Sequence, residues 1–319
     1  MGGPTHHRAH RSPGGGYEIP GIIRPRQFQD APRRTPRQRR MTATPTTAWL
    51  RCRRRHPAPR YRLVVFPHAG GSANPYCTWA EGLPADGETW VVCYPGRESR
   101  LGEPLIDTMD ELTDAITDAL LPLATAPPNL PPLILLGHSM GASVAYETAR
   151  RLRTRVPGSV ARLVVSARSA PGVGRPTRVH TLPRDQFIDV LRAHGGTDEA
   201  LFEHDELMDL VIPAVRNDYR LIETYQPPAD PTLPVDVVAF AATDDRTVRV
   251  EDVLAWAGTT TTGFDHAVFP GSHFYLLAEP GPVIAELTRH LPVPSGRASR
   301  PADASATTTA TTAAPMSRR

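Results

Sequence analysis

The sequence predicts an α/β fold in which helices cover both faces of a mostly parallel central sheet. Short apolar runs recur from Tyr61 onward, and most are continuous rather than alternating, as expected of strands buried on both faces. Segments of helical periodicity separate the runs, which is typical of a doubly wound sheet. The expected strands are residues 62–66, 89–94, 133–137, 162–167, 235–241 and 266–271.

The expected helices follow from apolar periodicity and from signals at their ends. Thr108 is a possible N-cap, and Glu111 three residues later completes a capping-box pattern at the start of the first helix. The helices expected to pack on the sheet are residues 108–124, 140–153, 250–257 and 280–291.

One long interval interrupts the alternation of strands and helices. About 65 residues without a strand pattern follow the run at 162–167, and inside them residues 183–195 and 205–225 are helical in period. An all-helical insertion at this place predicts a lid over a site, from about residue 181 to 225. Extra packing on the edge of the sheet is the alternative.

The charge of the chain is distributed unevenly. The formal net charge is +3, yet residues 1–60 hold 14 arginines and two acidic residues, whereas residues 61–292 hold 18 arginines and 30 acidic residues. The central region is therefore near −12, and the basic character comes from the ends. A basic domain would favour nucleic-acid binding, but this central region does not support it.

The two ends are expected to be disordered, because their composition cannot bury enough apolar surface to offset the entropy of ordering. Residues 1–40 are rich in Arg, Pro and Gly, and residues 293–319 are a low-complexity tail. Residues 41–292 then form the folded domain. No apolar run of 18 or more residues predicts a membrane span, and residues 1–40 lack the apolar centre of a secretory signal.

The three cysteines predict a reducing environment. Cys52, Cys77 and Cys93 show neither metal-ligand spacing nor a Cys-x-x-Cys pair. Free thiols in a reducing cytosol explain this pattern, so we expect a cytoplasmic protein.

The stretch LILLGHSMGAS (133–143) predicts a nucleophile. Ser139 lies in a Gly-x-Ser-x-Gly pattern between Gly137 and Gly141, with a buried strand before it and a helix after it. In this setting the serine sits on a sharp, strained strand-to-helix turn, and the glycines leave room for neighbouring backbone. An ordinary serine near a helix start is the alternative.

A serine nucleophile needs a base, and the base needs an acid that orients it. With this type of turn the chain order is Ser, then Asp or Glu, then His. Asp244 and Asp245 follow the run that ends near Ala241, and both are candidates for the acid. His273 lies in the loop between the last strand and the last helix, which makes it the candidate base.

Two segments are expected to supply the oxyanion hole. One donor is the backbone N–H of Met140, directly after the nucleophile. The other comes from the loop VVFPHAGGSA (64–73), where Gly70 and Gly71 let the backbone approach a substrate. His68 in this loop is expected to serve as a wall or hydrogen-bonding residue of the substrate site.

Five stretches, taken together, resemble the type II thioesterases that accompany modular polyketide and nonribosomal peptide synthetases. The resemblance runs from about Trp49 to about Leu291 and implies an α/β-hydrolase fold with a helical lid. The chain from Met41 is similar to the usual start of that family, which makes residues 1–40 an upstream extension. The stretches are FPHAGGSA, YPGRESRLGEP, LLGHSMGA, LIETYQP and FPGSHFYL.

The resemblance assigns roles to the candidate residues. It makes Ser139 the nucleophile and His273 the general base, and it places the oxyanion hole at the N–H groups of Ala69 and Met140.

The same resemblance chooses between the two aspartates. The family pattern of Asp before Pro-x-Val matches DRTV, which favours Asp245 over Asp244. Two departures leave Asp244 open as the alternative: Arg246 stands where the family has Pro, and Ala242 stands where Gly is usual.

The function that the resemblance implies is hydrolysis of acyl groups from the phosphopantetheine arm of an acyl or peptidyl carrier protein. The reaction would remove aberrant or stalled chains and would need no metal or organic cofactor, no nucleic acid and no membrane. Carrier proteins are commonly acidic, so an acidic enzyme would need a local basic patch to meet one. The candidates for that patch are Arg97, Arg100, Arg216 and Arg220.

Three other functions remain open. A general carboxylesterase or lipase-like hydrolase would use the same residues on oxygen esters. A catalytically silent module would bind carrier proteins without turning them over. A product-releasing cyclase of the same fold is the third alternative.

Overall fold

The computed structural model describes residues 46–52, 55–127, 129–196 and 199–292. The predicted extension 1–40, its boundary at Met41 and the predicted tail 293–319 lie outside the described residues.

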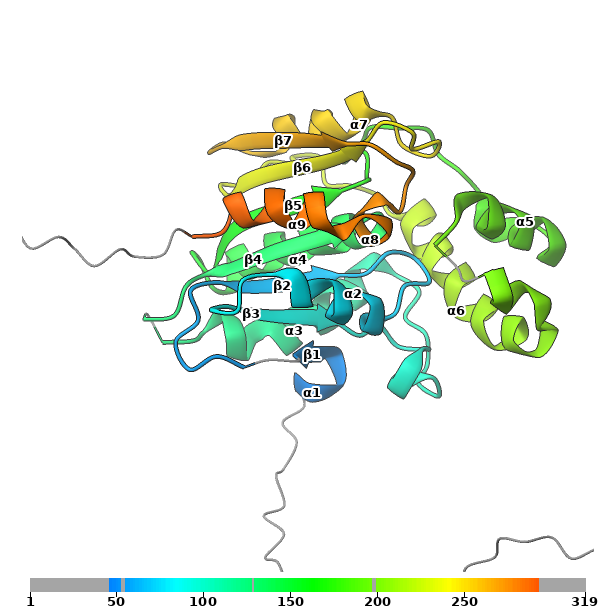
Figure 1. Ribbon diagram of the computed structural model, residues 1–319, viewed down its shortest axis with the longest axis horizontal. Coiled ribbons are helices and arrows are strands. Elements are labelled where there is room, and N and C mark those ends of the chain that lie inside the picture. The colour runs from blue at the N-terminus through cyan, green and yellow to red at the C-terminus, as the bar shows by residue number, and fades with distance from the viewer. Residues whose placement is uncertain (1–45, 53–54, 128, 197–198, 293–319) are drawn as a thin grey trace, which may run out of the picture. The chain divides into compact units, whose positions relative to one another are not determined.

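Seven strands of the described chain form one sheet in the order β1-β3-β2-β4-β5-β6-β7 (Figure 1). The six strands from β2 to β7 run parallel, and the short β1 pairs antiparallel with β3. All six predicted strands are confirmed. Their bounds are β1 Leu50–Cys52, β2 Arg62–Phe66, β3 Glu88–Val92, β4 Leu133–His138, β5 Val160–Ser166, β6 Asp236–Ala242 and β7 Phe264–Phe269.

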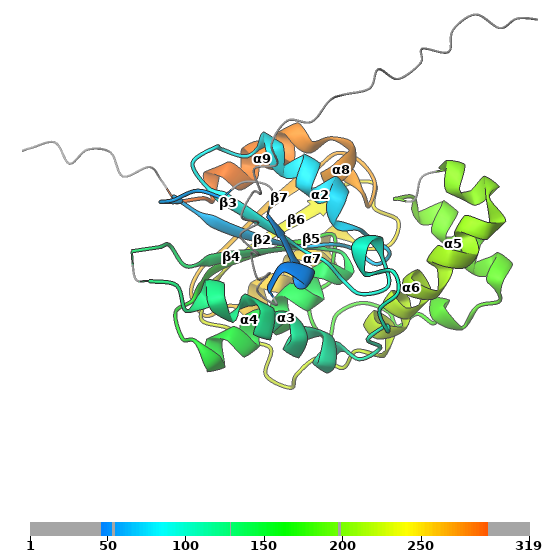
Figure 2. The same cartoon turned by 90° about the horizontal axis from the view of Figure 1, so that it is seen from below.

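Helices cover both faces of the sheet, as predicted. Figure 2 shows α3 and α4 on one side and α2, α8 and α9 on the other, and each set packs into its own buried apolar cluster against the strands. The helices outside the insertion are α1 Thr46–Trp49, α2 Ala73–Trp79, α3 Met109–Ala124, α4 Met140–Arg155, α7 Val250–Leu254, α8 Tyr275–Ala278 and α9 Pro280–Arg289, with 3₁₀ turns η1 Ala80–Gly82, η2 Glu98–Arg100 and η5 Ala255–Thr259.

The predicted start of α3 is confirmed in part. Thr108 is the N-cap, and its hydroxyl accepts a hydrogen bond from the Glu111 N–H at 3.3 Å. The predicted helix at 250–257 is divided into α7 and η5. Sequence periodicity missed α1, β1, α2 and α8, because each of them spans seven residues or fewer and is too short to show a period.

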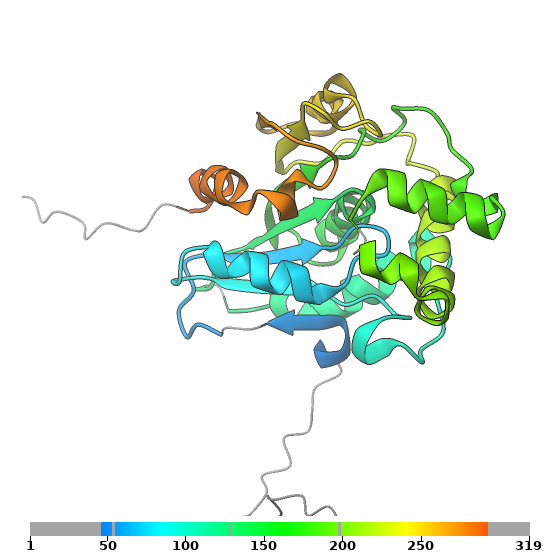
Figure 3. The same cartoon turned by 45° about the vertical axis from the view of Figure 1, so that its right-hand side comes forward.

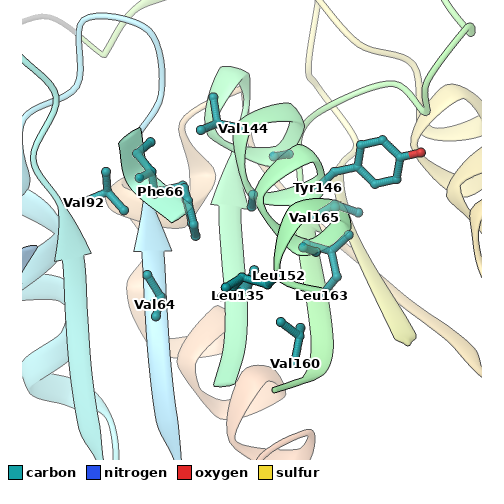
Figure 4. Close-up of a cluster of buried hydrophobic side chains, with 14 of the residues drawn as sticks. Val64, Phe66, Val92, Leu135, Val144, Tyr146, Leu152, Val160, Leu163 and Val165 are labelled. Atoms are coloured by element: carbon teal, nitrogen blue, oxygen red, sulfur yellow. The ribbon is translucent and has the colours of Figure 1, made fainter. Parts of the chain in front are cut away.

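Helix α4 lies against the centre of the sheet. Figure 4 shows Val144 and Leu152 of this helix in front of strand side chains such as Leu135 and Val165, and all four are fully buried. Burying one such aliphatic side chain contributes roughly 2 kcal/mol. This interface therefore fixes the N-terminus of α4 relative to the ends of β2, β4 and β5.

The secondary-structure elements described between β5 and β6 are all helices or 3₁₀ turns, which confirms the predicted helical insertion. Helices α5 and α6 pack on each other through Phe187, Leu191, Met208, Ile212 and Val215, and Figure 3 shows them together beside the sheet. Within the described segments, no helix has the length and apolar character that crossing a membrane requires. The elements of the insertion are η3 Val179–Thr181, α5 Arg184–His194, η4 Glu199–Glu203 and α6 Asp205–Thr224.

Candidate active site

The turn between β4 and α4 holds Ser139 in a strained backbone conformation, with φ 55° and ψ −122°. The N–H of Ser139 donates to the carbonyl of Ser166 at the end of β5, at 2.8 Å. A Cβ added to Gly137 would lie 2.1 Å from the Gly141 carbonyl oxygen, and one added to Gly141 would lie 2.0 Å from the Phe66 carbonyl oxygen. Both positions therefore require glycine, because neighbouring backbone atoms occupy the space that a side chain would need.

His273 connects the serine to a carboxylate. Its Nε2 lies 2.9 Å from Ser139 Oγ, and its Nδ1 lies 2.7 Å from Asp245 Oδ2. The three residues come from the turns after β4, β6 and β7, which meet at the same edge because those strands are parallel. Asp244 instead accepts hydrogen bonds from the N–H of Gly271 and the hydroxyl of Thr243. Of the two predicted candidates, Asp245 is the one that the structure brings to His273.

The surroundings of Asp245 keep its carboxylate ionised. Burial would raise its pKa, but hydrogen bonds from His273 and Thr247 outweigh burial and hold the pKa below its usual range. The hydroxyl and N–H of Thr247 donate to Oδ1 at 2.7 and 2.8 Å. This local turn closes the loop although Arg246 replaces the family's proline. The sequence analysis missed Thr247. Its position two residues after Asp245 is typical of a turn closed by the aspartate side chain and could have indicated this contact.

The loop after β2 lies on the other side of the serine turn. Its Gly71 N–H donates to the His68 carbonyl at 2.9 Å, and its Gly70 N–H donates to Asp218 Oδ2 at 2.7 Å. For the N–H groups of Ala69 and Met140, the two predicted oxyanion donors, no acceptor exists within the described residues. Met140 is also the first residue of α4, where the helix dipole favours a negative charge.

His68 is buried in the structure. Its Nδ1 lies 2.7 Å from the hydroxyl of Tyr76, and its ring contacts Phe274 edge-to-face at 4.8 Å. Burial, together with the nearby charges of His273 and Arg97, lowers the pKa of His68 to about 3. This imidazole is therefore neutral at physiological pH.

His138 is a second neutral imidazole beside the catalytic candidate, and sequence reasoning had not singled it out. It is fully buried, its ring lies 5.4 Å from that of His273, and its Nδ1 lies 3.0 Å from Ser166 Oγ. Burial holds its pKa well below the usual value. Of the three adjacent histidines, His273 alone reaches the serine.

The prediction of a basic docking patch is wrong for Arg97 and Arg100, two of its four residues. The side chains of Arg97 and Arg100 are only 11% and 6% exposed, and they pair with Asp218 and Glu103. Folding buries the loop that carries both arginines, so their charges form ion pairs within the protein.

The other two arginines of the predicted patch keep some contact with solvent. Arg216 donates to the carbonyls of His180 and Leu182, whereas Arg220 is about half exposed beside Asp107.

Within the described segments, no cluster of three or more His, Cys, Asp or Glu side chains could hold a metal ion.

The mostly parallel sheet, the serine on a strand-to-helix turn and the Ser-His-Asp contacts are those of the α/β-hydrolase fold. A family model described as "Thioesterase domain" matches residues 61–291, and the chain belongs to this family of thioesterases.

Relatives and solved structures agree with this family. Thioesterase PikA5 of Streptomyces venezuelae is 38% identical over 252 residues, which cover 78% of this chain and 87% of the relative. A probable cadicidin biosynthesis thioesterase of Streptomyces griseus is also 38% identical, over 78% of this chain and 68% of its own length. The solved type II thioesterase BorB, from the borrelidin biosynthetic cluster, superposes with a TM-score of 0.66 at 34% identity, covering 76% and 96% of the two chains.

The steric requirement at the serine turn gives a first prediction. We expect Gly141→Ala to lower the free energy of unfolding by at least about 3 kcal/mol, because the new methyl group meets the backbone of β2. The matched control is Gly281→Ala in the first turn of α9, where nothing lies within 4 Å of an added Cβ. It should be neutral or stabilising by up to about 1 kcal/mol in urea unfolding. Equal effects of the two substitutions would contradict the steric account.

The buried His68 gives a prediction for pH. Its folded-state pKa lies below the unfolded value, so between about pH 6.5 and 3 the unfolded state binds a proton that the folded state does not. Its contribution to stability is complete above pH 6.5 and falls by up to about 1.4 kcal/mol per pH unit on acidification. Urea unfolding from pH 7 to pH 5 should therefore show a shallower loss for His68→Gln than for wild type. The exposed His266→Gln should keep the wild-type slope, and a His68→Gln slope equal to it would refute the assignment.

Proposed function

We propose that this chain hydrolyses acyl groups from the phosphopantetheine arm of carrier proteins through an acyl-enzyme on Ser139. The observation that carries the proposal is the position of His273, within hydrogen-bond distance of both Ser139 and Asp245 in a member of the thioesterase family. Asp245 holds the imidazole so that Nδ1 carries a proton and Nε2 is free to accept one.

In the first half-reaction Ser139 Oγ attacks the thioester carbonyl carbon while His273 Nε2 takes its proton. The negative charge moves to the carbonyl oxygen, where the N–H groups of Ala69 and Met140 would receive it. Collapse of this intermediate breaks the carbon–sulfur bond, and the pantetheine sulfur leaves as a thiol with the proton from His273. Thiolates are good leaving groups, so this step needs little assistance from an acid.

In the second half-reaction water replaces the thiol. His273 takes a proton from the water molecule, the hydroxide attacks the Ser139 ester, and the proton returns to Ser139 Oγ as the free acid departs. Burial lowers the pKa values of His68 and His138, so neither ring adds a positive charge beside His273.

The substrate and partner follow from the relatives. One relative is a probable thioesterase of cadicidin biosynthesis, and the solved BorB is a type II thioesterase from the borrelidin biosynthetic cluster. Both support a stand-alone enzyme that clears aberrant or stalled acyl chains from an assembly line. The carrier protein would therefore be the partner, in the cytoplasm where such synthetases work. Helices α5 and α6 beside the site would act as the lid that selects the acyl chain.

The two adjacent aspartates give a sharp test of this mechanism. With an acylated carrier protein as substrate, we expect Asp245→Asn to lower kcat by about 10⁴-fold, because the imidazole loses its orienting anion. Asp244→Asn should stay within about threefold of wild type, since its carboxylate accepts hydrogen bonds from Thr243 and Gly271 rather than from His273. Release of free acid, followed by mass spectrometry, measures both. A larger loss in Asp244→Asn would reverse the assignment of the acid.

The choice of substrate separates this function from the alternatives. Wild type should turn over acyl-pantetheine thioesters with a higher kcat/KM than oxygen esters of the same acyl group, and Ser139→Ala should abolish both activities. Equal or better use of oxygen esters would indicate a general carboxylesterase. Binding of the carrier protein without any release of acid would indicate a silent binding module.

A further inference from the structure

A buried ion pair connects the helical insertion to the loop predicted to form the oxyanion hole. Asp218 of α6 accepts two hydrogen bonds from Arg97, at 2.7 and 2.9 Å, and a third from the Gly70 N–H at 2.7 Å. The Asp218 side chain is 5% exposed and that of Arg97 is 11% exposed. Three segments far apart in the sequence therefore meet at one carboxylate.

The two charged residues fix the peptide groups of the turn from His68 to Gly71. Besides the Gly70 N–H held by Asp218, the Gly71 carbonyl accepts from Arg97 at 3.2 Å, and the His68 carbonyl accepts from the Gly71 N–H. In a trans peptide the C=O and N–H groups point in opposite directions. Because the His68 carbonyl faces into the turn, the N–H of Ala69 in the same peptide must face out of it.

Helix α6 is seated on the core around this pair. A Cβ on Gly70 would lie 3.0 Å from a methyl group of Val215, so the helix touches the turn directly, and Gly70 has φ +77°. One residue before Asp218, the Asn217 amide donates to the Ile106 carbonyl at 2.7 Å. Helix α5 lies beside α6 (Figure 3) and packs on it through an apolar cluster that also includes Val215. The face of α6 that carries Asp218 is thus a fixed contact with the core.

Stability alone is a weak reason for this pair. Two charges removed from water contribute little net stability even when well paired, and apolar residues of similar volume often serve as well. Burial disfavours the charge on Arg97, but Asp218 outweighs burial and raises the Arg97 pKa above its usual value. The bidentate geometry supplies orientation, which an apolar contact would not.

We propose that Asp218 and Arg97 are positioning residues that hold the Ala69 N–H toward the oxygen of the tetrahedral intermediate. Helix α6 is then a fixed part of the catalytic centre rather than a freely moving lid. This inference rests on the proposed function, because it assigns the Ala69 N–H to thioester hydrolysis.

The test uses Asp218→Asn and Arg97→Lys in the full chain, with a short acyl thioester of N-acetylcysteamine as substrate. Removal of a whole oxyanion donor costs about 10²–10³-fold in kcat, so misorientation should cost roughly 10–100-fold. KM should stay within about threefold, because the ground-state carbonyl gains little from this donor. The affinity for a trifluoromethyl ketone, which forms a tetrahedral adduct with serine, should fall by the same factor as kcat. The pH profile of kcat should not shift, since His273 and Asp245 are untouched.

Two controls separate positioning from folding. Arg184→Gln removes two exposed ion pairs between α5 and α6, formed with Asp205 and Asp209, and should leave kcat and KM at wild-type values. The double variant Asp218→Leu with Arg97→Met replaces the buried pair by apolar side chains, which should restore the melting temperature lost in Asp218→Asn. Its kcat should nevertheless stay low, because neither new side chain can hold the turn.

Wild-type kcat in folded Asp218→Asn, or recovery of kcat together with Tm in the double variant, would overturn the inference. A rise in KM alone would overturn it too, since this would indicate a substrate-binding role. If Asp218→Asn does not fold, the double variant supplies the same test. Wild type without thioester hydrolysis would refute the proposed function itself, whereas active wild type with unaffected variants would refute only the positioning role.

Discussion

The contact of backbone with backbone around Ser139 is the constraint on which the rest of the site depends. Ser139 keeps φ at 55° because β4 ends and α4 begins with no side chain on Gly137 or Gly141. The carbonyl of Phe66 occupies the space that a Cβ on Gly141 would need. The turn therefore sets the position of the Ser139 hydroxyl, of the first N–H of α4 and of the loop that follows β2 in a single arrangement.

Electrostatics distinguish His273 from the two other histidines beside it, His68 and His138. Burial keeps His68 and His138 neutral, whereas His273 lies between an ionised Asp245 and the hydroxyl of Ser139. Arg97 and Asp218, two further charges near the site, pair with each other. In the proposed mechanism, Asp245 is the anion that stabilises a protonated His273, which is the species that forms when Ser139 loses its proton.

The sequence was sufficient for the elements whose signal is local. The buried parallel strands and the strand-turn-helix setting of Ser139 were predictable, because burial on both faces and the glycine spacing are written in consecutive residues. The role of Arg97 could not be predicted, because its partner Asp218 lies 121 positions away in the sequence. An arginine is expected on the surface unless the fold is known to bury it. The choice between Asp244 and Asp245 rested on the family pattern and needed the loop geometry, which Thr247 sets.

The central claim is that Ser139 carries the acyl group between the two half-reactions. The most direct measurement mixes the enzyme with an acylated carrier protein, stops the reaction with acid within milliseconds, and maps the modified peptide by mass spectrometry. The account predicts the acyl mass on Ser139, with release of the carrier thiol before release of the free acid. Turnover with Ser139 unmodified, or an acyl group on another residue, would contradict it.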